Sequence, residues 1–520
     1  MDYSEDDKKI LNYFFTNLNK PVFAARNFHP EVWALMQARY SRSREGLRQG
    51  FLNLLKEDPD NFEKLKSEIE KTRGGIGSKH ATEKAIQFME RWVLGYGHSS
   101  IAEGAVIGLC LEGISILATK VIEDNRLCSF IEKSTRYVSF DEGSFYIDEE
   151  LENSEFSREI KELISLLFRT YMELHEPVLE YVKKISPRDS KTPVPAWERA
   201  CAARRFDAIR YLLPTCTKTS LGWTVNARQL AHGISKLLSH PLKEMNEIGE
   251  MIKEEASKVL PSLLRYADKN KYFTETEKAM EEAAAEININ DSNSEPVTLV
   301  SCPSDADDIV VASILYKYKK QPMAKVLEKV KKMPASEKGK IFDAYLGKMG
   351  QFDYPMRELE HVQFIFDIII DYGAFRDLQR HRICTQTSQI FTTNLGYSVP
   401  DDIKNAGVLE KYKKAMEKAK EVYGKAAKKY PLHAQYLLPL GFKKRYLLTM
   451  NLREIYYIIK LRTIPLAHES YRKIAYLIYK KFKEKYPFLS KYIVCNYSKE
   501  ELGRLKSEIK TEQMETVGPL

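Results

Sequence analysis

The sequence has few cysteines and no closely spaced pair of them. Seven cysteines are spread over 520 residues, an odd number, and no two of them form a CxxC pattern. An odd number of scattered cysteines without a CxxC pair argues against a disulfide framework and against a cysteine zinc site. The histidines also lack the spacing of metal ligands, and we expect no metal. This usage is typical of a protein of the reducing cytoplasm, and we expect a cytoplasmic location.

Long apolar runs and targeting signals are also missing. The longest apolar stretch, residues 105–119, is interrupted by Glu112. It falls short of the roughly 20 residues that a membrane span needs. Residues 1–8 are acidic and polar, unlike a secretory signal. We therefore expect a soluble protein that does not contact a membrane.

Charge of one sign is only modestly in excess. The formal net charge is +9, and much of it comes from lysine runs such as residues 413–414, 428–429 and 480–485. Such runs are usually solvated helix faces, so nucleic-acid binding is not expected. The glycines of residues 74–77 lack the GxGxxG spacing of a phosphate-binding loop, and we expect an ordinary loop there.

The length indicates more than one domain. A chain of 520 residues exceeds a single hydrophobic core. Residues 281–296 have the polar composition of a linker, and the residues that follow are typical of a strand, a turn and a helix start. We predict one domain at residues 1–280 and a second at residues 297–520.

The two domains contain an internal repeat. Pro214 and Pro439 each end a Leu-Leu-Pro segment, and each precedes by twelve residues the asparagine of a Thr-x-Asn-x-Arg segment that opens a helical pattern. The first copy has about 31 additional residues, which we place within residues 141–190; residues 156–184 have an amphipathic helical pattern. Each half combines helices with strands such as residues 362–368, which predicts a helix-rich α+β domain.

A basic block follows the apolar stretch of residues 364–379. It consists of Arg380, His381 and Arg382. Two guanidiniums around an imidazole, next to a segment with core character, are expected to face an anion. A lone block of this kind is more often a cap at a helix C-terminus, where cations are favoured. The matching blocks elsewhere in the two copies favour the functional interpretation.

The blocks of both copies resemble the flavin-dependent thymidylate synthase family. The resemblance rests on the Arg-His-Arg block, the Thr-x-Asn-x-Arg segments and the Ser-x-Arg-Tyr element at residues 134–137, and it extends over most of both halves. Members of the family have an α/β domain and form homotetramers with nucleotide pockets at subunit interfaces. They bind FAD and methylate dUMP with methylenetetrahydrofolate and reduced pyridine nucleotide. The resemblance implies two such domains in tandem, arranged as a pseudo-dimer.

The two copies keep different parts of the family's site. The first copy keeps four substrate-binding positions: Glu132, Ser134, Arg136 and Arg210. We also assign catalytic roles to Ser134, Arg136 and Arg210. The second copy keeps the basic block and a late arginine, which bind nucleotide or flavin in the family: Arg380, His381, Arg382 and Arg462. Other residues replace the missing halves: Asp124, Asn125 and Leu237 in the first copy, and Ser388, Ile390, Thr392 and Gln435 in the second.

These losses are complementary, and they predict one composite pocket. That pocket would combine the family residues of both copies: Ser134, Arg136, Arg210, Arg380, His381 and Arg462. The symmetry-related pocket would be inactive and filled by side chains, because it would pair Asp124 and Leu237 with Ile390 and Thr392. Both Asn-x-Arg pairs match flavin-contacting positions of the family: Asn226 and Arg228 in the first copy, and Asn451 and Arg453 in the second. His98 matches a further flavin-contacting position, in the first copy only.

The resemblance implies reductive methylation of dUMP to dTMP, with FAD as the cofactor and NADPH and methylenetetrahydrofolate as co-substrates. Arg210 would stabilise negative charge on the pyrimidine ring. A homodimer of the two-copy chain would replace the family's homotetramer. Three alternatives stay open: a non-catalytic relative that binds flavin or nucleotide, a flavoenzyme that acts on another pyrimidine, such as one within RNA, and a purely structural helical protein that cannot be loaded with FAD.

Overall fold

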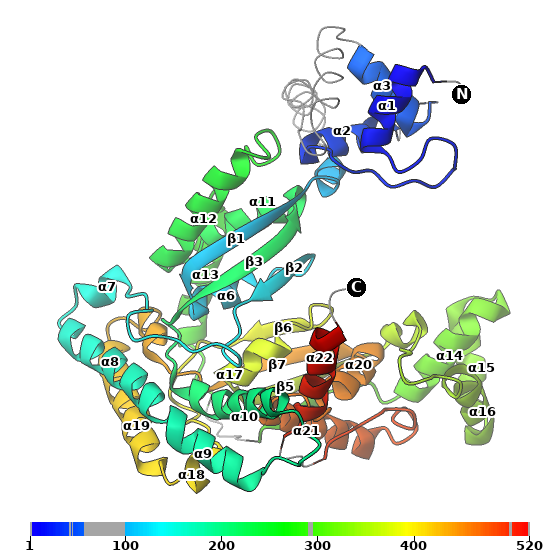
Figure 1. Cartoon of the computed structure of the whole chain (residues 1–520). Coiled ribbons are helices and arrows are strands. Elements are labelled where there is room, and N and C mark those ends of the chain that lie inside the picture. The colour runs from blue at the N-terminus through cyan, green and yellow to red at the C-terminus, as the bar shows by residue number, and fades with distance from the viewer. Residues whose placement is uncertain are drawn as a thin grey trace. The chain divides into compact units, whose positions relative to one another are not determined.

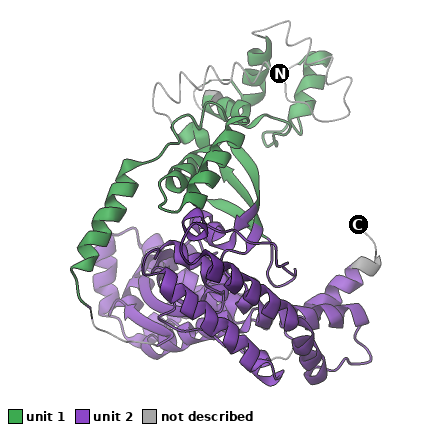
Figure 2. Cartoon of the chain, turned by 90° about the vertical axis from the view of Figure 1, so that its left-hand side faces the viewer, with its two compact units in different colours: residues 1–112, 127–132, 220–288 green, residues 113–126, 133–219, 289–520 purple. Residues whose placement is uncertain are grey.

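The computed structural model describes residues 3–40, 43, 45–56, 99–289, 295–498 and 502–517. The chain forms two compact units, which Figure 2 colours green and purple. Unit 1 consists of residues 1–112, 127–132 and 220–288, and unit 2 of residues 113–126, 133–219 and 289–520. These units cut across the two repeats, so the domain boundaries at residues 280 and 297 stay predictions.

Unit 1 is built around a three-stranded sheet. Its strands lie in the order β1-β3-β2 (Val106–Ser115, Lys218–Asn226, Cys128–Glu132), and β2 is antiparallel to β3. Phe130 and Trp223 lie opposite each other on these two strands and stack with 5.8 Å between ring centroids, which stabilises the register. The helices of this unit include α1 (Glu5–Phe14), α2 (Pro30–Tyr40), α3 (Leu47–Lys56), η2 (Ser99–Glu103), α11 (Ala227–Leu238), α12 (Lys243–Ser257) and α13 (Lys271–Ala285).

Unit 2 contains a four-stranded antiparallel sheet (Figure 1). Its strands lie in the order β4-β5-β7-β6 (Val297–Ser301, Gln363–Asp371, Lys443–Asn451, Thr385–Ser388). Phe364, Phe366 and Ile368 of β5 are fully buried, because alternate side chains of a strand point to the same face. The helices that pack against this sheet are α17 (Tyr372–Leu378), α20 (Leu452–Arg462) and α21 (Glu469–Lys485).

Further helices on the described part of the chain also belong to unit 2. Those of the first repeat are α6 (Ile116–Ile122), α7 (Glu149–Glu152), α8 (Ser157–Glu173), α9 (His175–Ile185), α10 (Val194–Ile209) and η3 (Arg210–Leu212). Those of the second repeat are α14 (Ala306–Lys319), α15 (Met323–Lys331), α16 (Ala335–Leu346), η4 (Arg357–His361), α18 (Asp401–Asn405), α19 (Leu409–Ala426), η5 (His433–Leu437) and α22 (Leu505–Val517).

The two sheets share one strand order, which confirms the tandem α+β fold. The order β1-β3-β2 in the first repeat corresponds to β5-β7-β6 in the second. In both repeats the next helix begins at the expected asparagine. Asn226 caps α11 by accepting from Gln229 N at 2.9 Å, and Asn451 caps α20 by accepting from Glu454 N at 2.9 Å. An asparagine oxygen at this place satisfies an N–H that has no partner within the helix.

The two Leu-Leu-Pro segments pair with each other inside unit 2. Their prolines face each other in an antiparallel bridge. Thr215 N donates to Leu438 O at 3.0 Å, and Leu440 N donates to Leu213 O at 2.9 Å. Each bond is the counterpart of the other in the repeat, so an approximate two-fold axis relates the two segments, as in an isologous interface.

The helix expected at residues 156–184 is two helices. α8 ends at Glu173, α9 begins at His175, and Pro177 lies in the first turn of α9. Proline has no N–H to donate to the preceding turn, so the helical ladder breaks here. α8 corresponds to α19, whereas the described residues 427–432 between α19 and η5 hold no helix. The structure thus places the additional residues of the first repeat at α9 and α10.

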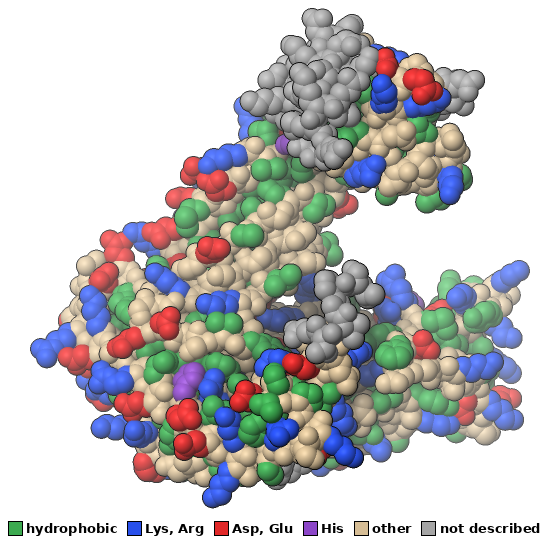
Figure 3. Space-filling model, viewed as in Figure 1, with side chains coloured by type: hydrophobic (Ala, Val, Ile, Leu, Met, Phe, Trp, Pro, Cys, Tyr) green, Lys and Arg blue, Asp and Glu red, His purple; other side chains and the backbone are tan. Residues whose placement is uncertain are grey.

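Ion pairs with carboxylates neutralise part of the positive charge of the surface lysines. α8 and α19 pack against each other, with Lys425 2.7 Å from Glu159 and Lys411 3.0 Å from Glu173. On the face drawn in Figure 3, Lys and Arg side chains are interspersed with Asp and Glu. Among the residues that the structure describes, no helix combines the length and the apolar character that crossing a membrane requires.

Candidate functional site

The charges of four arginines of unit 2 act on the carboxyl group of Asp377. Arg136 and Arg210 come from the first repeat, and Arg380 and Arg462 from the second. Burial alone would raise the pKa of Asp377, but these guanidiniums hold it below its usual value. We call these four residues the arginine cluster. The structure therefore brings together arginines that the sequence assigns to one composite pocket.

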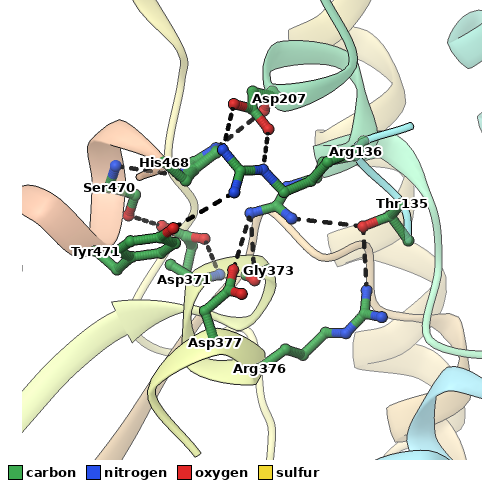
Figure 4. A network of polar contacts seen from close by, with 12 residues as sticks. Thr135, Arg136, Asp207, Asp371, Gly373, Arg376, Asp377, His468, Ser470 and Tyr471 are labelled. Atoms are coloured by element: carbon green, nitrogen blue, oxygen red, sulfur yellow. Dashed lines mark hydrogen bonds and ion pairs between the residues drawn. The ribbon is translucent and has the colours of Figure 1, made fainter. Parts of the chain in front are cut away.

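Arg136 is fixed by a carboxylate of α10 (Figure 4). Its Nε and Nη2 donate to Oδ1 and Oδ2 of Asp207 at 2.6 and 2.8 Å, and its Nη1 donates to the Tyr471 hydroxyl at 3.4 Å. Such a bidentate pair gives a guanidinium both affinity and a defined orientation. Residues from α10 and α21 thus hold one side chain of the Ser-x-Arg element in place.

Arg210 is deeply buried, at 2% exposure. Its Nη1 donates to Thr135 Oγ1 at 3.4 Å, and its Nη2 donates to the Gly373 carbonyl at 3.3 Å and lies 3.9 Å from Asp377 Oδ2. Its Nε has no hydrogen-bond partner among the described residues. A buried N–H without a partner is costly, so this guanidinium can take one more acceptor favourably.

Arg462 and His381 form a hydrogen-bonded pair. Arg462 Nε donates to His381 Nε2 at 2.8 Å, and Arg462 Nη2 donates to the Asp377 carbonyl at 2.8 Å. A ring nitrogen that accepts a hydrogen bond carries no proton. Burial lowers the pKa of His381 to about 3, and the charge of Arg462 adds to the effect. His381 is therefore neutral near pH 7, and the basic block contributes two positive charges.

The basic block follows the C-terminal end of α17. Asp371 caps the start of this helix, its Oδ1 accepting from Ala374 N at 2.8 Å. After the helix, Arg380 is exposed and Arg382 is half-buried. A helix C-terminus favours cations, so the capping interpretation of the block and the functional one are compatible.

Thr135 and Arg376 are among the side chains of the site that sequence reasoning missed. Thr135 Oγ1 accepts from Arg210 Nη1 and from Arg376 Nη1, both at 3.4 Å. Arg376 lies on α17, four residues before Arg380, which places it one helical turn from the basic block. The sequence could have indicated Arg376 through this spacing, and Thr135 through its position inside the Ser-x-Arg element.

Other residues assigned from the sequence lie as follows. The Ser134 hydroxyl accepts from Arg136 N at 3.2 Å and so shapes the loop that carries Arg136. Glu132 ends β2 and belongs to unit 1. His98 lies outside the described residues. The roles in binding and catalysis that the resemblance implies for these residues stay predictions.

The Asn-x-Arg segments serve the framework of each repeat. Besides the asparagine caps, Arg228 lies 2.7 Å from Glu103, and Arg453 lies 2.8 Å from Glu360. Arg453 Nε also donates to the Pro355 carbonyl at 2.7 Å. The same ion pair therefore recurs at equivalent positions of both repeats. Contact of these residues with a flavin stays a prediction.

The second copy fills the positions that correspond to Thr135 and Arg210. Phe391 stands in place of Thr135 and is fully buried, with its ring 4.5 Å from that of Tyr372. Its backbone N donates to Gln435 Oε1 at 3.0 Å, and Gln435 stands in place of Arg210. A ring and an amide thus occupy the second copy where the first has a hydroxyl and a guanidinium. The pairing expected for Leu237, a residue of unit 1, stays a prediction.

Comparison with known proteins agrees with the internal repeat. A family model described as thymidylate synthase complementing protein matches residues 36–262 and 298–488. The UPF0159 protein of Chlamydia pneumoniae is 33% identical over 531 residues and covers 98% of both chains. The UPF0159 protein of Thermoplasma acidophilum is 28% identical over 462 residues, which are 82% of this chain and 92% of the relative.

A partial relative is named for an activity. The flavin-dependent thymidylate synthase of Clostridium tetani is 24% identical over 192 residues, which are 36% of this chain and 74% of that enzyme. The two regions matched by the family model together exceed half of the chain and confirm the tandem arrangement. The chain therefore belongs to the thymidylate synthase complementing protein family, related to the flavin-dependent thymidylate synthases, and it contains the family's domain twice.

Proposed function

We propose that the chain is an FAD-dependent thymidylate synthase-like enzyme with one composite active site. It would convert dUMP to dTMP by reductive methylation, with methylenetetrahydrofolate and NADPH as co-substrates. The observation that carries the proposal is that arginines of both repeats act on Asp377: the charges of all four act on its carboxyl group, Arg210 lies 3.9 Å from it, and Arg462 donates to its carbonyl at 2.8 Å. Each repeat contributes two of these four arginines. Family membership and the name of the partial relative support the type of reaction.

The arginine cluster suits the phosphate of a nucleotide. Its four guanidiniums lie with two carboxylates, those of Asp207 and Asp377, so positive charge is in excess. Guanidiniums bind phosphate oxygens through paired hydrogen bonds. Asp207 already holds Arg136 in one orientation, and a prearranged side chain loses less entropy on binding. We assign the phosphate to the exposed side of the cluster, with Ser134 as a further donor.

Arg210 would act on the pyrimidine ring. It is buried, its charge is fixed by Thr135 and Asp377, and its Nε has capacity for one more acceptor. In a site that excludes water, such a fixed charge stabilises negative charge that develops on a carbonyl oxygen. The other task of the protein is to hold the nucleotide in one orientation, which lowers the barrier without further chemistry.

The described donors fit the anionic parts of FAD. Arg380, a member of the arginine cluster, is exposed, and Arg382, two residues further along the chain, is half-buried, so both can reach a diphosphate. When bound, FAD would supply the hydride chemistry that protein side chains lack, with NADPH as the source of electrons. Neutral His381 would keep Arg462 in place during binding, because it accepts from Arg462 Nε.

We infer a homodimer as the working form. The pairing of the two Leu-Leu-Pro segments supports a pseudo-dimer of repeats within one chain. Two chains would then correspond to the four domains of the family's homotetramer. Sedimentation analysis should give a particle of twice the chain mass of 60.2 kDa.

A non-catalytic role in binding flavin or nucleotide is the second candidate. One observation favours it: Arg136 and Arg462 already have protein partners in Asp207 and His381. The Asn-x-Arg segments are likewise engaged in helix caps and ion pairs. Under this candidate, the cluster would bind an anion and hold the fold together without turnover.

Turnover by the FAD-loaded full-length chain separates these candidates. NADPH oxidation should depend on dUMP, and dTMP should form when methylenetetrahydrofolate is added. Binding of FAD and dUMP without turnover would support the non-catalytic role. A chain that binds neither would contradict both candidates. Steeply salt-dependent RNA binding in place of dUMP binding would indicate a flavoenzyme acting on a pyrimidine in RNA.

A further inference from the structure

The C-terminal segment, of which the structure describes residues 489–498 and 502–517, lies beyond the regions matched by the family model, which end at residue 488. It ends in α22, which packs against α10 within unit 2. Arg199 of α10 anchors it, with Nε 2.9 Å from Glu508 and Nη2 2.7 Å from Glu512. α10 also carries Asp207. The segment is therefore fixed to the helix that orients one side of the proposed site.

The same segment is fixed beside the other side of the site. Asn496 N donates to Thr463 Oγ1 at 2.9 Å, and Thr463 directly follows Arg462 in the chain. The ring of Tyr497 stacks on that of Tyr476 with 4.5 Å between centroids. The segment thus has one anchor next to Arg462 and a second on α10.

Arg504 lies just before α22 and is buried, at 6% exposure. Its Nη2 donates to Asp207 Oδ2 at 3.4 Å, the same oxygen that accepts from Arg136 Nη2 at 2.8 Å. Its guanidinium lies over the Tyr137 ring, 4.8 Å from the centroid. Its Nη1 has no hydrogen-bond partner among the residues that the structure describes.

The charges at this point are unbalanced. Asp207 is shared by two guanidiniums, those of Arg136 and Arg504, and Asp377, the other carboxylate that acts on Arg136, is shared with the rest of the arginine cluster. A charge held away from water without compensation is costly, and so is a buried N–H without an acceptor. An anion bound between the two arginines would relieve both costs. A phosphate is suitable, because its oxygens accept from several guanidiniums at once.

We propose that Arg504 is a further substrate-binding residue, which contacts the nucleotide phosphate together with Arg136. The C-terminal segment, a part of the chain beyond both family-matched regions, would thus complete the composite site. This inference rests on the proposed function, because that function identifies the anion as the phosphate of dUMP.

Isothermal titration calorimetry on the FAD-loaded full-length chain tests the assignment. The two probes are dUMP and deoxyuridine, which lacks the phosphate. Arg504→Ala should raise the Kd for dUMP about tenfold or more, as expected for the loss of a charged hydrogen bond to phosphate, and should leave the Kd for deoxyuridine unchanged. Arg504→Lys keeps the charge and should recover part of the affinity. Arg158→Ala, an exposed arginine paired with Glu162, is the control and should change neither Kd.

Each failure of this test has a distinct meaning. An unchanged Kd for dUMP in Arg504→Ala, with wild-type binding intact, would overturn the assignment and leave the proposed function standing. An equal loss of affinity for dUMP and deoxyuridine would reveal a merely structural role and would also overturn it. A wild-type chain that binds neither dUMP nor inorganic phosphate would overturn both proposals. If Arg504→Ala does not fold, Arg504→Lys should bind dUMP more tightly than Arg504→Gln, and equal affinities would overturn the assignment.

Discussion

Arg462 donates a hydrogen bond from Nε to Nε2 of His381 at 2.8 Å. Because this ring nitrogen accepts, the imidazole is neutral, in agreement with a pKa of His381 that burial lowers to about 3. The same contact sets the orientation of Arg462, whose Nη2 reaches the Asp377 carbonyl at 2.8 Å. A neutral histidine thus positions one guanidinium of the arginine cluster, and protonation of that histidine would disrupt the arrangement.

Folding stability should therefore decrease below neutral pH through His381. The folded-state pKa of about 3 lies below the ordinary value of 6.5, so between these pH values the unfolded chain binds more protons than the folded protein. The contribution of this group is complete above pH 6.5 and is lost as the pH falls towards 3. At a pH of about 5, the loss from this one group is about 2 kcal/mol.

Urea unfolding of wild type and His381→Gln at two pH values measures this effect. From a pH of about 7.5 to about 5, the free energy of unfolding should fall less in His381→Gln than in wild type, because one linked group has been removed. His361→Gln, at an exposed position, is the matched control and should keep the wild-type decrease. Equal decreases in all three proteins would contradict a role for His381.

Affinity for dUMP should depend on arginines of both repeats. Arg136→Ala and Arg380→Ala should each raise the Kd about ten- to a hundredfold, the loss expected for charge-assisted bonds to a phosphate. Each repeat provides a matched control for the other. Thr392 of the second copy stands in place of Arg136, and Asp124 of the first copy stands in place of Arg380. Thr392→Ala and Asp124→Ala should leave the Kd unchanged.

The double variant of Arg136 and Arg380 decides whether the two side chains share one anion. Two arginines that bind the same phosphate are coupled, so the combined loss of binding free energy should differ from the sum of the single losses by about 0.5 kcal/mol or more. Calorimetric titration with dUMP measures all three variants. Strictly additive losses of binding free energy would indicate two separate anion sites and would contradict the composite pocket.

Local signals explain why much of the fold could be predicted. The asparagines at 226 and 451 start helices because their side chains accept from the first turn, and this needs no distant partner. The alternation in β5 reflects one buried face. The break between α8 and α9 also has a local cause in Pro177, but the apolar periodicity on both sides of it concealed the break.

The carboxylates and the last arginine of the site could not be predicted in this way. Asp207 stands 71 residues from Arg136 in the sequence, and Arg504 stands 297 residues from Asp207. These three meet only because α10 and α22 pack together, and packing of distant helices leaves no pattern in a single sequence. The arginine pairs could be expected to meet because each repeat had lost the half of the motif that the other kept.

Removal of the Asp207 charge should weaken both folding and binding. Asp207→Asn keeps the shape of the side chain but releases Arg136, so the free energy of unfolding should fall by about 1–3 kcal/mol, less than for a fully buried pair because these side chains are partly exposed. The Kd for dUMP should rise, because Arg136 loses its orientation. Urea unfolding and calorimetric titration measure the two effects.

Asp402 provides a matched control for that variant. It accepts from Arg204 Nε and Nη2 at 2.8 and 2.7 Å, a bidentate pair that involves α10, as the pair of Asp207 does. Asp402→Asn should lower the free energy of unfolding by a similar amount and leave the Kd for dUMP unchanged. If Asp402→Asn weakens dUMP binding as much as Asp207→Asn does, the effect is general destabilisation and the positioning role of Asp207 is wrong.

Phe391 and Thr135, at equivalent positions of the two copies, should respond in opposite ways. The Phe391 ring is fully buried against Tyr372, so Phe391→Ala should lower the free energy of unfolding by about 3–5 kcal/mol through the cavity it leaves. Its position belongs to the predicted inactive pocket, so the Kd for dUMP should not change.

Thr135→Ala removes the hydroxyl that accepts from Arg210 and Arg376, so it should raise the Kd for dUMP while destabilising the fold less than Phe391→Ala does. Urea unfolding and calorimetric titration of both folded variants separate the two effects. The opposite result, loss of dUMP binding in Phe391→Ala and normal binding in Thr135→Ala, would place the working pocket in the second copy. Complementary loss of motif halves would then no longer explain why the chain keeps both repeats.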